Sequence, residues 1–265
     1  ILYRLVGSEM CIRDSLQRIT ESGSSIEKES VVVETAIQLN ALDENGHTIT
    51  HATLLATPTD LIELHAGHIL SEGYTFDTLT KESFVHIDTP HHIIQYEGRL
   101  TVTPRNRPVT SSCGACNHPG LLVSNVHGVI DSSAFIDLEL QYIHDALDKL
   151  TSNMPLFHES GACHGAGLLF LDDGLRFVSE DIGRHNAVDK TIGKATLAGI
   201  NDFHNAILLL SGRCGWDIVA KAVRSSIPAI ASIGAFSSAA VELAREHGVT
   251  LFGFVKNDGA WKAGY

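Results

Sequence analysis

Two cysteines separated by two residues could carry chemistry in this sequence. They lie in the segment Cys113-Gly114-Ala115-Cys116. Thiols at this spacing can share a proton, chelate a metal ion or exchange a disulfide, and a thiolate close to cations or to a helix N-terminus is a stronger nucleophile. The spacing therefore indicates zinc ligation or redox or sulfur chemistry, and the pair alone does not decide between them.

A zinc site would need two further ligands. Cys163 and His164 could complete the set, although adjacent residues rarely both face one ion. The chain has no second Cys-x-x-Cys segment. A zinc deaminase needs His-x-Glu followed by Pro-Cys-x-x-Cys. Here no His-x-Glu precedes the pair and Ser112 stands before Cys113, which excludes deaminase chemistry.

Small residues surround a second cysteine, in the segment GACHGAG at 161–167. Glycines in such number indicate a backbone that another group approaches closely. The alternative is a tight turn that leads into a buried strand, with Cys163 as a small apolar residue. The residues leave both interpretations open.

The segment EDIGRHNAVDK at 180–190 is expected to open a helix with Asp181 as its N-cap. Arg184 and His185 would lie in the first turn, where cations oppose the helix dipole unless an anion is near. His185 and Asp189 are one turn apart, so we expect them to pair. The alternative is a solvated polar face.

A fourth segment, Ser211-Gly212-Arg213, follows the apolar run AILLL. A small turn between a strand and a helix N-terminus, with an arginine beside it, is typical of phosphate binding. The segment matches neither the Walker pattern nor the dinucleotide fingerprint, so it is a weak signal alone.

The elements that position these residues differ between the two halves of the chain. In the first half we expect a hairpin over 31–56 with Asn45-Gly46 in its turn. A helix is expected next, with Thr57 as its N-cap, Pro58 as its first residue and Gly73 as its stop. Short strands are expected at 82–87, 92–96 and 99–103, before a linker at 104–108. This half is β-rich with one helix.

The second half shows helical spacing over 132–150 and strand patterns at 166–171 and 175–178. From 206 onward strands and helices alternate, with strands expected at 206–210, 229–233 and 249–255 and helices at 216–226 and 237–247. This order predicts parallel strands with right-handed crossovers. Ligands in such sheets bind beyond the carboxyl ends of the strands.

Three segments are expected along the chain. Residues 1–15 have no pattern that continues into residues 16–30, so we interpret them as a translated cloning or sequencing leader or as a poorly ordered native tail, and exclude Cys11 from the chemistry. Residues 16–108 form a β-rich subdomain. Residues 109–265 form an α/β domain that carries the cysteine pair and the other site residues.

Composition limits the function classes. The formal charge is −12, from 19 basic and 31 acidic residues, which argues against a nucleic-acid polymer as partner. No apolar run approaches the roughly 18 residues that a membrane span needs. Five cysteines in a chain of 265 residues indicate reduced thiols and a cytoplasmic location.

Taken together, the motifs resemble the formate dehydrogenase accessory sulfurtransferase family, FdhD. The matching segments lie at 56–73, 111–116, 161–168, 180–193, 208–213 and 227–256. The resemblance implies a cytidine-deaminase-like three-layer α/β fold with a β-rich addition, in a homodimer. It also implies a sulfur carrier that receives a persulfide from a cysteine desulfurase. The carrier would pass the sulfur to the bis-guanine-dinucleotide molybdenum cofactor for the formate dehydrogenase apoprotein.

The resemblance also implies site residues. Cys113 would carry the persulfide and Cys116 would activate or resolve it. The cofactor, bound as cargo and without a permanent metal, would contact a set of residues along the second half of the chain: His164, Gly183, Arg184, His185, Asn186, Ser211, Gly212, Arg213, Phe254, Val255, Lys256, Asn257, Asp258 and Gly259.

The sequence departs from the family pattern at Cys163, at Cys214 and in the tail NDGAWKAGY. Two alternatives to sulfur transfer remain. One is a chaperone that binds the cofactor or a guanine nucleotide without sulfur chemistry. The other is a structural zinc protein that uses Cys113, Cys116, Cys163 and His164.

Overall fold

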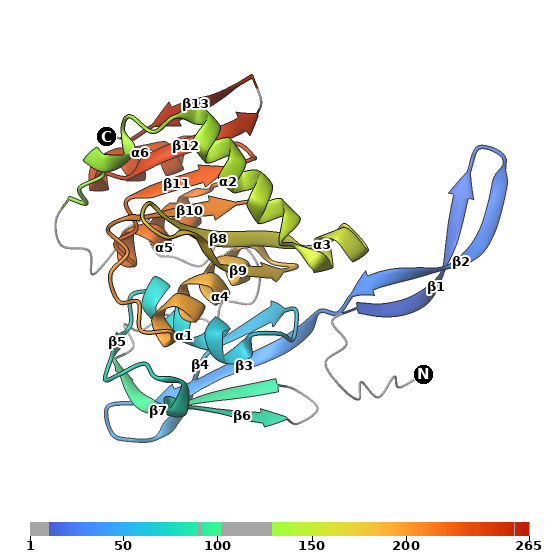
Figure 1. Ribbon diagram of the computed structural model, residues 1–265. Coiled ribbons are helices and arrows are strands. Elements are labelled where there is room, and N and C mark those ends of the chain that lie inside the picture. The colour runs from blue at the N-terminus through green and yellow to red at the C-terminus, as the bar shows by residue number, and fades with distance from the viewer. Residues whose placement is uncertain (1–10, 89–91, 102–128, 257, 265) are drawn as a thin grey trace.

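A six-stranded sheet forms the centre of the protein (Figure 1). The computed structural model describes residues 11–88, 92–101, 129–256 and 258–264. The strands of this sheet are β8 (His164–Phe170), β9 (Gly174–Asp181), β10 (Ala206–Leu210), β11 (Ala229–Ser232), β12 (Thr250–Lys256) and β13 (Gly259–Ala263), in the order β13-β12-β11-β10-β8-β9. As expected, β10, β11 and β12 are parallel. The neighbours β8 and β13 run antiparallel to them.

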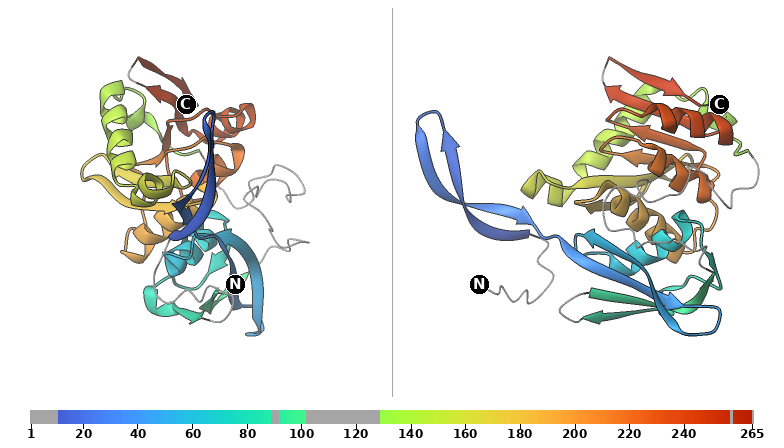
Figure 2. Two further views of the ribbon diagram at one scale, coloured as in Figure 1. Left: turned by 90° about the vertical axis from the view of Figure 1, so that its right-hand side faces the viewer. Right: turned by 180° about the vertical axis from the view of Figure 1, so that it is seen from behind.

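Helices cover both faces of this sheet. On one face lie α4 (Arg184–Leu197), α5 (Trp216–Arg224) and α6 (Ser238–His247), which pack against Leu208 and Ile230. On the other face lies α2 (Leu140–Ser152), which packs against Leu209 and Ala231. Alternate residues of β10 and β11 thus pack against helices on opposite faces of the sheet. All of these residues are apolar or small because both faces are covered. The three-layer α/β fold is confirmed (Figures 1 and 2).

The first half of the chain builds a second sheet with its own core. Its strands are β3 (Thr35–Leu42), β4 (Thr48–Ala56), β5 (Thr75–Phe76), β6 (Phe84–Asp88) and β7 (His92–Thr101), in the order β4-β3-β7-β5 with β6 also paired to β7. Helix α1 (Leu61–Ser71) packs Leu64 and Ile69 onto Ile94 and Tyr96. The proposed division near residue 108 lies outside the described residues and stays a prediction.

Helices α1 and α4 join the two halves through glycine contacts. A Cβ atom on Gly67 would lie 1.7 Å from the backbone oxygen of Asp189, and one on Gly193 would lie 1.9 Å from that of Glu63. Only glycine lets the two backbones approach this closely. Beside the crossing, buried Lys221 donates to Asp189 at 2.7 Å and to Glu72 at 2.7 Å, which ties α5 to both helices.

Three expected boundaries in this part of the structure are wrong. The first helix begins at Leu61 with Asp60 as its N-cap, rather than at Pro58 with Thr57 as its N-cap. Thr57 instead binds the end of β9: its N–H donates to Asp181 at 3.0 Å and its hydroxyl accepts from Ile182 N at 3.2 Å. The strands expected at 92–96 and 99–103 are one strand, β7. The helix expected over 132–150 is a 3₁₀ turn at Ser133–Phe135 followed by α2.

A hairpin of β1 (Cys11–Thr20) and β2 (Gly23–Val32) extends away from the body (Figure 2). The expected leader boundary at residue 15 therefore falls inside a strand, and the prediction that 11–15 continue no pattern is wrong. The cause is pairing with β2, which a pattern within 1–15 does not show. The remaining elements are η1 (Lys81–Ser83) and α3 (Pro155–Ser160). None of the described helices is long and apolar enough to span a membrane.

Buried histidines line the inner side of α1. His65 is fully buried, and its Nε2 lies 2.7 Å from Nε2 of His51 on β4. Burial, and then the neighbouring His51 and His68, hold the pKa of His65 well below its ordinary value. His65 is therefore neutral in the folded protein.

Replacing Gly67 with alanine is expected to destabilise the protein by about 3 kcal/mol, because the new methyl group would overlap a backbone carbonyl that cannot move freely. Urea denaturation measures the free energy of unfolding. Gly259→Ala is the control, since nothing lies within 4 Å of its Cβ position. Equal stability of the two variants would contradict the close crossing.

Acid is expected to destabilise the fold through His65. His65 takes up a proton near the ordinary histidine pKa in the unfolded chain but not in the folded protein. The contribution of neutral His65 to the stability of the fold is therefore complete above the ordinary pKa and is lost as the pH falls below it. The loss approaches about 1.4 kcal/mol per pH unit. His65→Gln should flatten the slope of unfolding free energy between pH 7 and 5, and an unchanged slope would show that His65 does not cause this loss of stability.

Candidate functional site

The ends of the central strands meet at one edge of the sheet, where backbone hydrogen bonds join the turns. Gly234 N–H donates to Gly212 O at 3.1 Å, and Phe254 N–H donates to Gly234 O at 3.0 Å. A Cβ on Gly234 would lie 2.8 Å from Gly212 O, so the turns after β10 and β11 touch through backbone. Ser211 binds this edge to β8, because its hydroxyl accepts from Gly165 N at 2.8 Å. The edge is therefore a continuous, glycine-lined surface.

His164 lies at this edge, at the start of β8. A Cβ on Gly212 would lie 3.0 Å from His164 Nδ1, so the imidazole packs directly on the turn after β10. Burial, and then the charges of Arg184 and Arg213, lower the pKa of His164. Its ring is therefore neutral at neutral pH and lies within the field of two arginines.

A cavity of about 340 Å³ opens where the turns before α5 and α6 meet. Cys214 N–H donates to Ala235 O at 2.9 Å, and Ser237 N–H donates to Cys214 O at 3.2 Å, which places the two helix N-termini side by side. The cavity is lined by Arg184, Arg213, Cys214, Gly215, Ala235, Phe236 and Ser237. Two arginines and two helix N-termini make it suited to an anion. We call it the arginine pocket.

Asp217, in the first turn of α5, joins two of the expected site residues. Its Oδ2 accepts from Arg184 Nη2 at 3.3 Å and from His185 Nε2. Burial opposes ionisation, but the hydrogen bond with His185 and the charges of His185 and Arg184 lower the pKa of Asp217 to about 2. Asp217 is therefore negative at neutral pH, between two basic side chains.

Asp181 organises the start of α4 from within the core. Asp181 ends β9 and is not the N-cap, which is Gly183. Its Oδ1 accepts from Gly183 N at 2.8 Å and from Asn186 Nδ2 at 2.9 Å, and its Oδ2 binds buried Lys190 at 2.6 Å. The carboxylate thus accepts hydrogen bonds at the start of α4, as the side chain of an N-cap would, although Asp181 belongs to the preceding strand. Asn186 also donates to Leu55 O at 2.7 Å, so both of its amide hydrogens point into the protein.

The expected pairing of His185 with Asp189 is wrong. His185 binds Asp217, and Asp189 is held by His68, Ser71 and Lys221. His185 and Asp189, one turn apart on α4, therefore bind different partners. Helical spacing predicts which side chains can meet on an isolated helix, but both partners here come from other helices.

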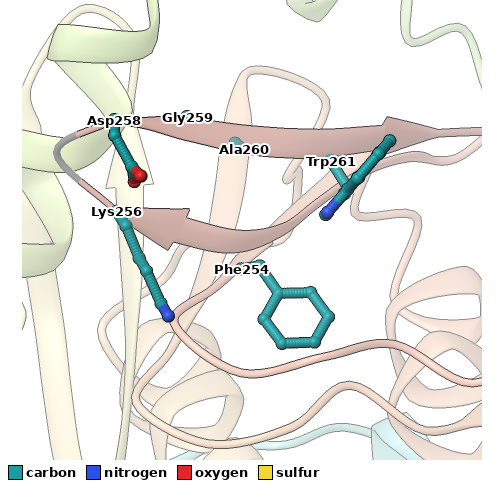
Figure 3. Close-up of a pocket in the computed structure, with 6 residues that line it drawn as sticks. All are labelled: Phe254, Lys256, Asp258, Gly259, Ala260 and Trp261. Carbon is teal, nitrogen blue, oxygen red and sulfur yellow. The ribbon is translucent and has the colours of Figure 1, made fainter.

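A second hollow, of about 370 Å³, lies under the hairpin of β12 and β13 (Figure 3). Its lining includes Phe254, Lys256, Asp258, Gly259, Ala260 and Trp261. The backbone of Phe254 is left-handed, with φ of 52°, at an irregularity between Gly253 and Lys256. Phe254 is 44% exposed and Trp261 is 69% exposed. Two exposed aromatic rings and one lysine offer a surface for a planar, charged ligand.

The expected cofactor residues are mostly brought together. Ten of them lie at the same edge of the sheet, namely His164, Gly183, Arg184, Ser211, Gly212, Arg213, Phe254, Lys256, Asp258 and Gly259. Val255 instead packs into the core beneath α2. Asn257, Cys113 and Cys116 lie outside the described residues. Sequence reasoning missed Asp217 and Trp261, since an acidic residue in a first helical turn and a tryptophan in an atypical tail gave no specific signal.

The two described cysteines of the domain are buried in different places. Cys163 is 4% exposed and packs with Val32 and Leu156, and Cys214 is 2% exposed in the core under α5. Burial raises the pKa of Cys163 to about 12 and also raises that of Cys214. Cys163 and His164 contact different parts of the fold. In the described segments, no group of three or more metal-binding side chains could hold an ion.

Comparison with known proteins identifies the family. The model of the FdhD/NarQ family matches residues 32–261. The chain belongs to this family. The sulfur carrier protein FdhD of Sulfurisphaera tokodaii is 32% identical over 242 residues, covering 91% of this chain and 92% of that protein. The protein of the same name from Thermoplasma acidophilum is 33% identical over 240 residues, covering 87% and 83%.

A solved structure agrees with this family. It is described as a formate dehydrogenase accessory protein from Desulfotalea psychrophila, and it has a TM-score of 0.74 and 25% sequence identity. The match covers 96% of this chain and 97% of the other. The resemblance inferred from the motifs is therefore confirmed for the family and for the fold.

Cys163 and Cys214 are expected to resist alkylation in the folded protein, because buried thiols with raised pKa values form little thiolate. Iodoacetamide at pH 8, followed by peptide mass spectrometry, should leave both unmodified until a denaturant is added. Rapid modification of either thiol in the native protein would place it among the reactive groups.

Proposed function

We propose that the chain is a sulfur carrier that serves the maturation of formate dehydrogenase. Relatives named sulfur carrier protein align with about nine-tenths of the chain. The structural observation that supports the proposal most strongly is the arginine pocket. It lies on the same sheet edge as the second hollow, with its exposed rings of Phe254 and Trp261, and together they offer a place for a large phosphorylated molecule.

Sulfur transfer would use the Cys113-Gly114-Ala115-Cys116 segment. The thiolate of Cys113 attacks the outer sulfur of a persulfide on a cysteine desulfurase. A new S–S bond forms on Cys113, the S–S bond of the donor breaks, and the donor cysteine leaves as a thiolate. Cys116 activates or resolves the resulting persulfide. Since Cys163 and Cys214 are buried with raised pKa values, they do not compete as nucleophiles.

The cargo would be the bis-guanine-dinucleotide molybdenum cofactor. Its phosphates are anionic and suit the arginine pocket, where Arg184 and Arg213 add charge to two helix N-termini. Its guanine bases are planar and suit the exposed rings of Phe254 and Trp261. His164, Ser211 and Gly212 lie beside the arginine pocket, where β8 and β10 meet the edge. Gly183 and Asn186 are buried and would act by holding Arg184 in place.

The partners expected for this role are a cysteine desulfurase, the formate dehydrogenase apoprotein and a second copy of the chain in a homodimer. We place these encounters in the cytoplasm, where the thiols stay reduced. One alternative function is a chaperone that binds the cofactor without sulfur chemistry. The observation in its favour is that the described residues by themselves give the two hollows their arginines, helix N-termini and aromatic rings.

Incubation with a cysteine desulfurase and cysteine is expected to add about 32 Da, the mass of one sulfur atom, to the peptide that carries residues 113–116. Mass spectrometry under non-reducing conditions detects the adduct. Cys113→Ala should abolish it, whereas Cys163→Ala and Cys214→Ala should not. An adduct that persists without Cys113 would move the carrier role to Cys116. Full maturation of the client by a Cys113→Ala, Cys116→Ala double variant would favour the chaperone.

A further inference from the structure

The two arginines of the arginine pocket are held very differently. Arg184 is partly buried, and its guanidinium donates to Asp217. Arg213 is exposed and makes no ion pair within the described parts of the chain. One cation is therefore fixed in direction before a ligand arrives, and the other must be ordered by the ligand.

Two hydrogen bonds hold the Asp217 carboxylate in turn. Its Oδ1 accepts from the backbone N–H of Ile218 at 3.0 Å, and its Oδ2 accepts from His185. Gly215 leaves room for it, because a Cβ there would lie 2.5 Å from Oδ1. The carboxylate cannot rotate without losing one of these bonds, so its contact with Arg184 has a defined direction.

The contact with Asp217 uses only part of the hydrogen-bonding capacity of Arg184. A guanidinium carries five N–H donors, and the Asp217 contact occupies one terminal nitrogen. Arg184 lines the cavity, so its other donors remain for a ligand there. The carboxylate of Asp217 thus orients the guanidinium of Arg184, whose remaining donors can bind an anion in the cavity.

We propose that Asp217 is a positioning residue, which acts through Arg184 to preorganise the arginine pocket for the phosphates of a guanine nucleotide. This inference rests on the proposed function, because it takes the pocket to be the phosphate subsite. A long side chain that becomes ordered on binding loses conformational entropy, which weakens affinity. Because Asp217 already holds Arg184 in the free protein, Arg184 loses less entropy when the ligand binds. The positioning effect must outweigh the repulsion between Asp217 and the ligand.

The test is a set of affinities measured by calorimetry on the full chain, with GDP and guanosine as probes. Asp217→Ala should weaken GDP binding about threefold to tenfold, the range that one ordered side chain accounts for. Asp217→Asn should lose less, because its amide oxygen can still accept from Arg184. Guanosine, which has no phosphate, should bind all three proteins equally.

A double-mutant cycle separates positioning from damage to the fold. Asp217→Ala should have no further effect on GDP affinity in an Arg184→Ala background. It should keep its full effect in an Arg213→Ala background, which is the matched control. Circular dichroism checks that each variant is folded.

Each other outcome overturns a specific claim. Unchanged or tighter GDP binding by Asp217→Ala would show that charge repulsion outweighs positioning. Equal loss in the Arg184→Ala background, or equal loss for guanosine, would show a general structural effect. If Arg184→Ala itself leaves GDP binding unchanged, the proposed phosphate contact fails. If Arg184→Ala weakens GDP binding but the double-mutant cycle shows no coupling between Asp217 and Arg184, only the positioning role of Asp217 fails.

Discussion

The buried carboxylate of Asp181 holds together the parts of the protein that form the site. It accepts hydrogen bonds from the segment after β4, from the N-cap of α4 and from Lys190 within α4. Both members of its ion pair are fully buried. Loss of one member of such a pair leaves an uncompensated charge in the core, which costs about 3–5 kcal/mol. The direction in which Arg184 leaves α4 therefore depends on a residue that is itself enclosed in the core.

The motif EDIGRHNAVDK thus divides its work between core and surface. Asn186 and Lys190 both donate to Asp181, and each also donates to a backbone carbonyl of the N-terminal half. Arg184 and His185 face α5, where Asp217 receives them. The polar residues of this segment are for the most part buried and hydrogen-bonded within the protein. This explains how its first turn can carry cations against the helix dipole, since a carboxylate from the next helix supplies the opposing charge.

Sequence patterns predicted the central sheet well and the contacts around it poorly. The apolar runs at 206–210, 229–233 and 249–255 specify buried parallel strands, and the structure has β10, β11 and β12 there. The N-cap at Asp181 and the pairing of His185 with Asp189 were wrong, because local rules see only neighbours along one helix. Asp217 lies 32 residues beyond His185 and reaches it only through the crossover from β10 to α5. Short spacing cannot show such a contact, and the topology predicted from 206 onward did not include the start of α4.

A net charge of −12 is compatible with an anion site because the field that a ligand meets is local. At the sheet edge, acidic groups are either paired, as Asp217 and Asp181 are, or lie away from the arginine pocket, as Asp258 does in the second hollow. Glycines at positions 212 and 234 bring backbone close together where side chains would fill the space. The fold thereby concentrates two arginines and two helix N-termini on one side of an acidic molecule. Such a surface presents a positive local field to a phosphate although the molecule as a whole is acidic, because salt screens the more distant acidic groups.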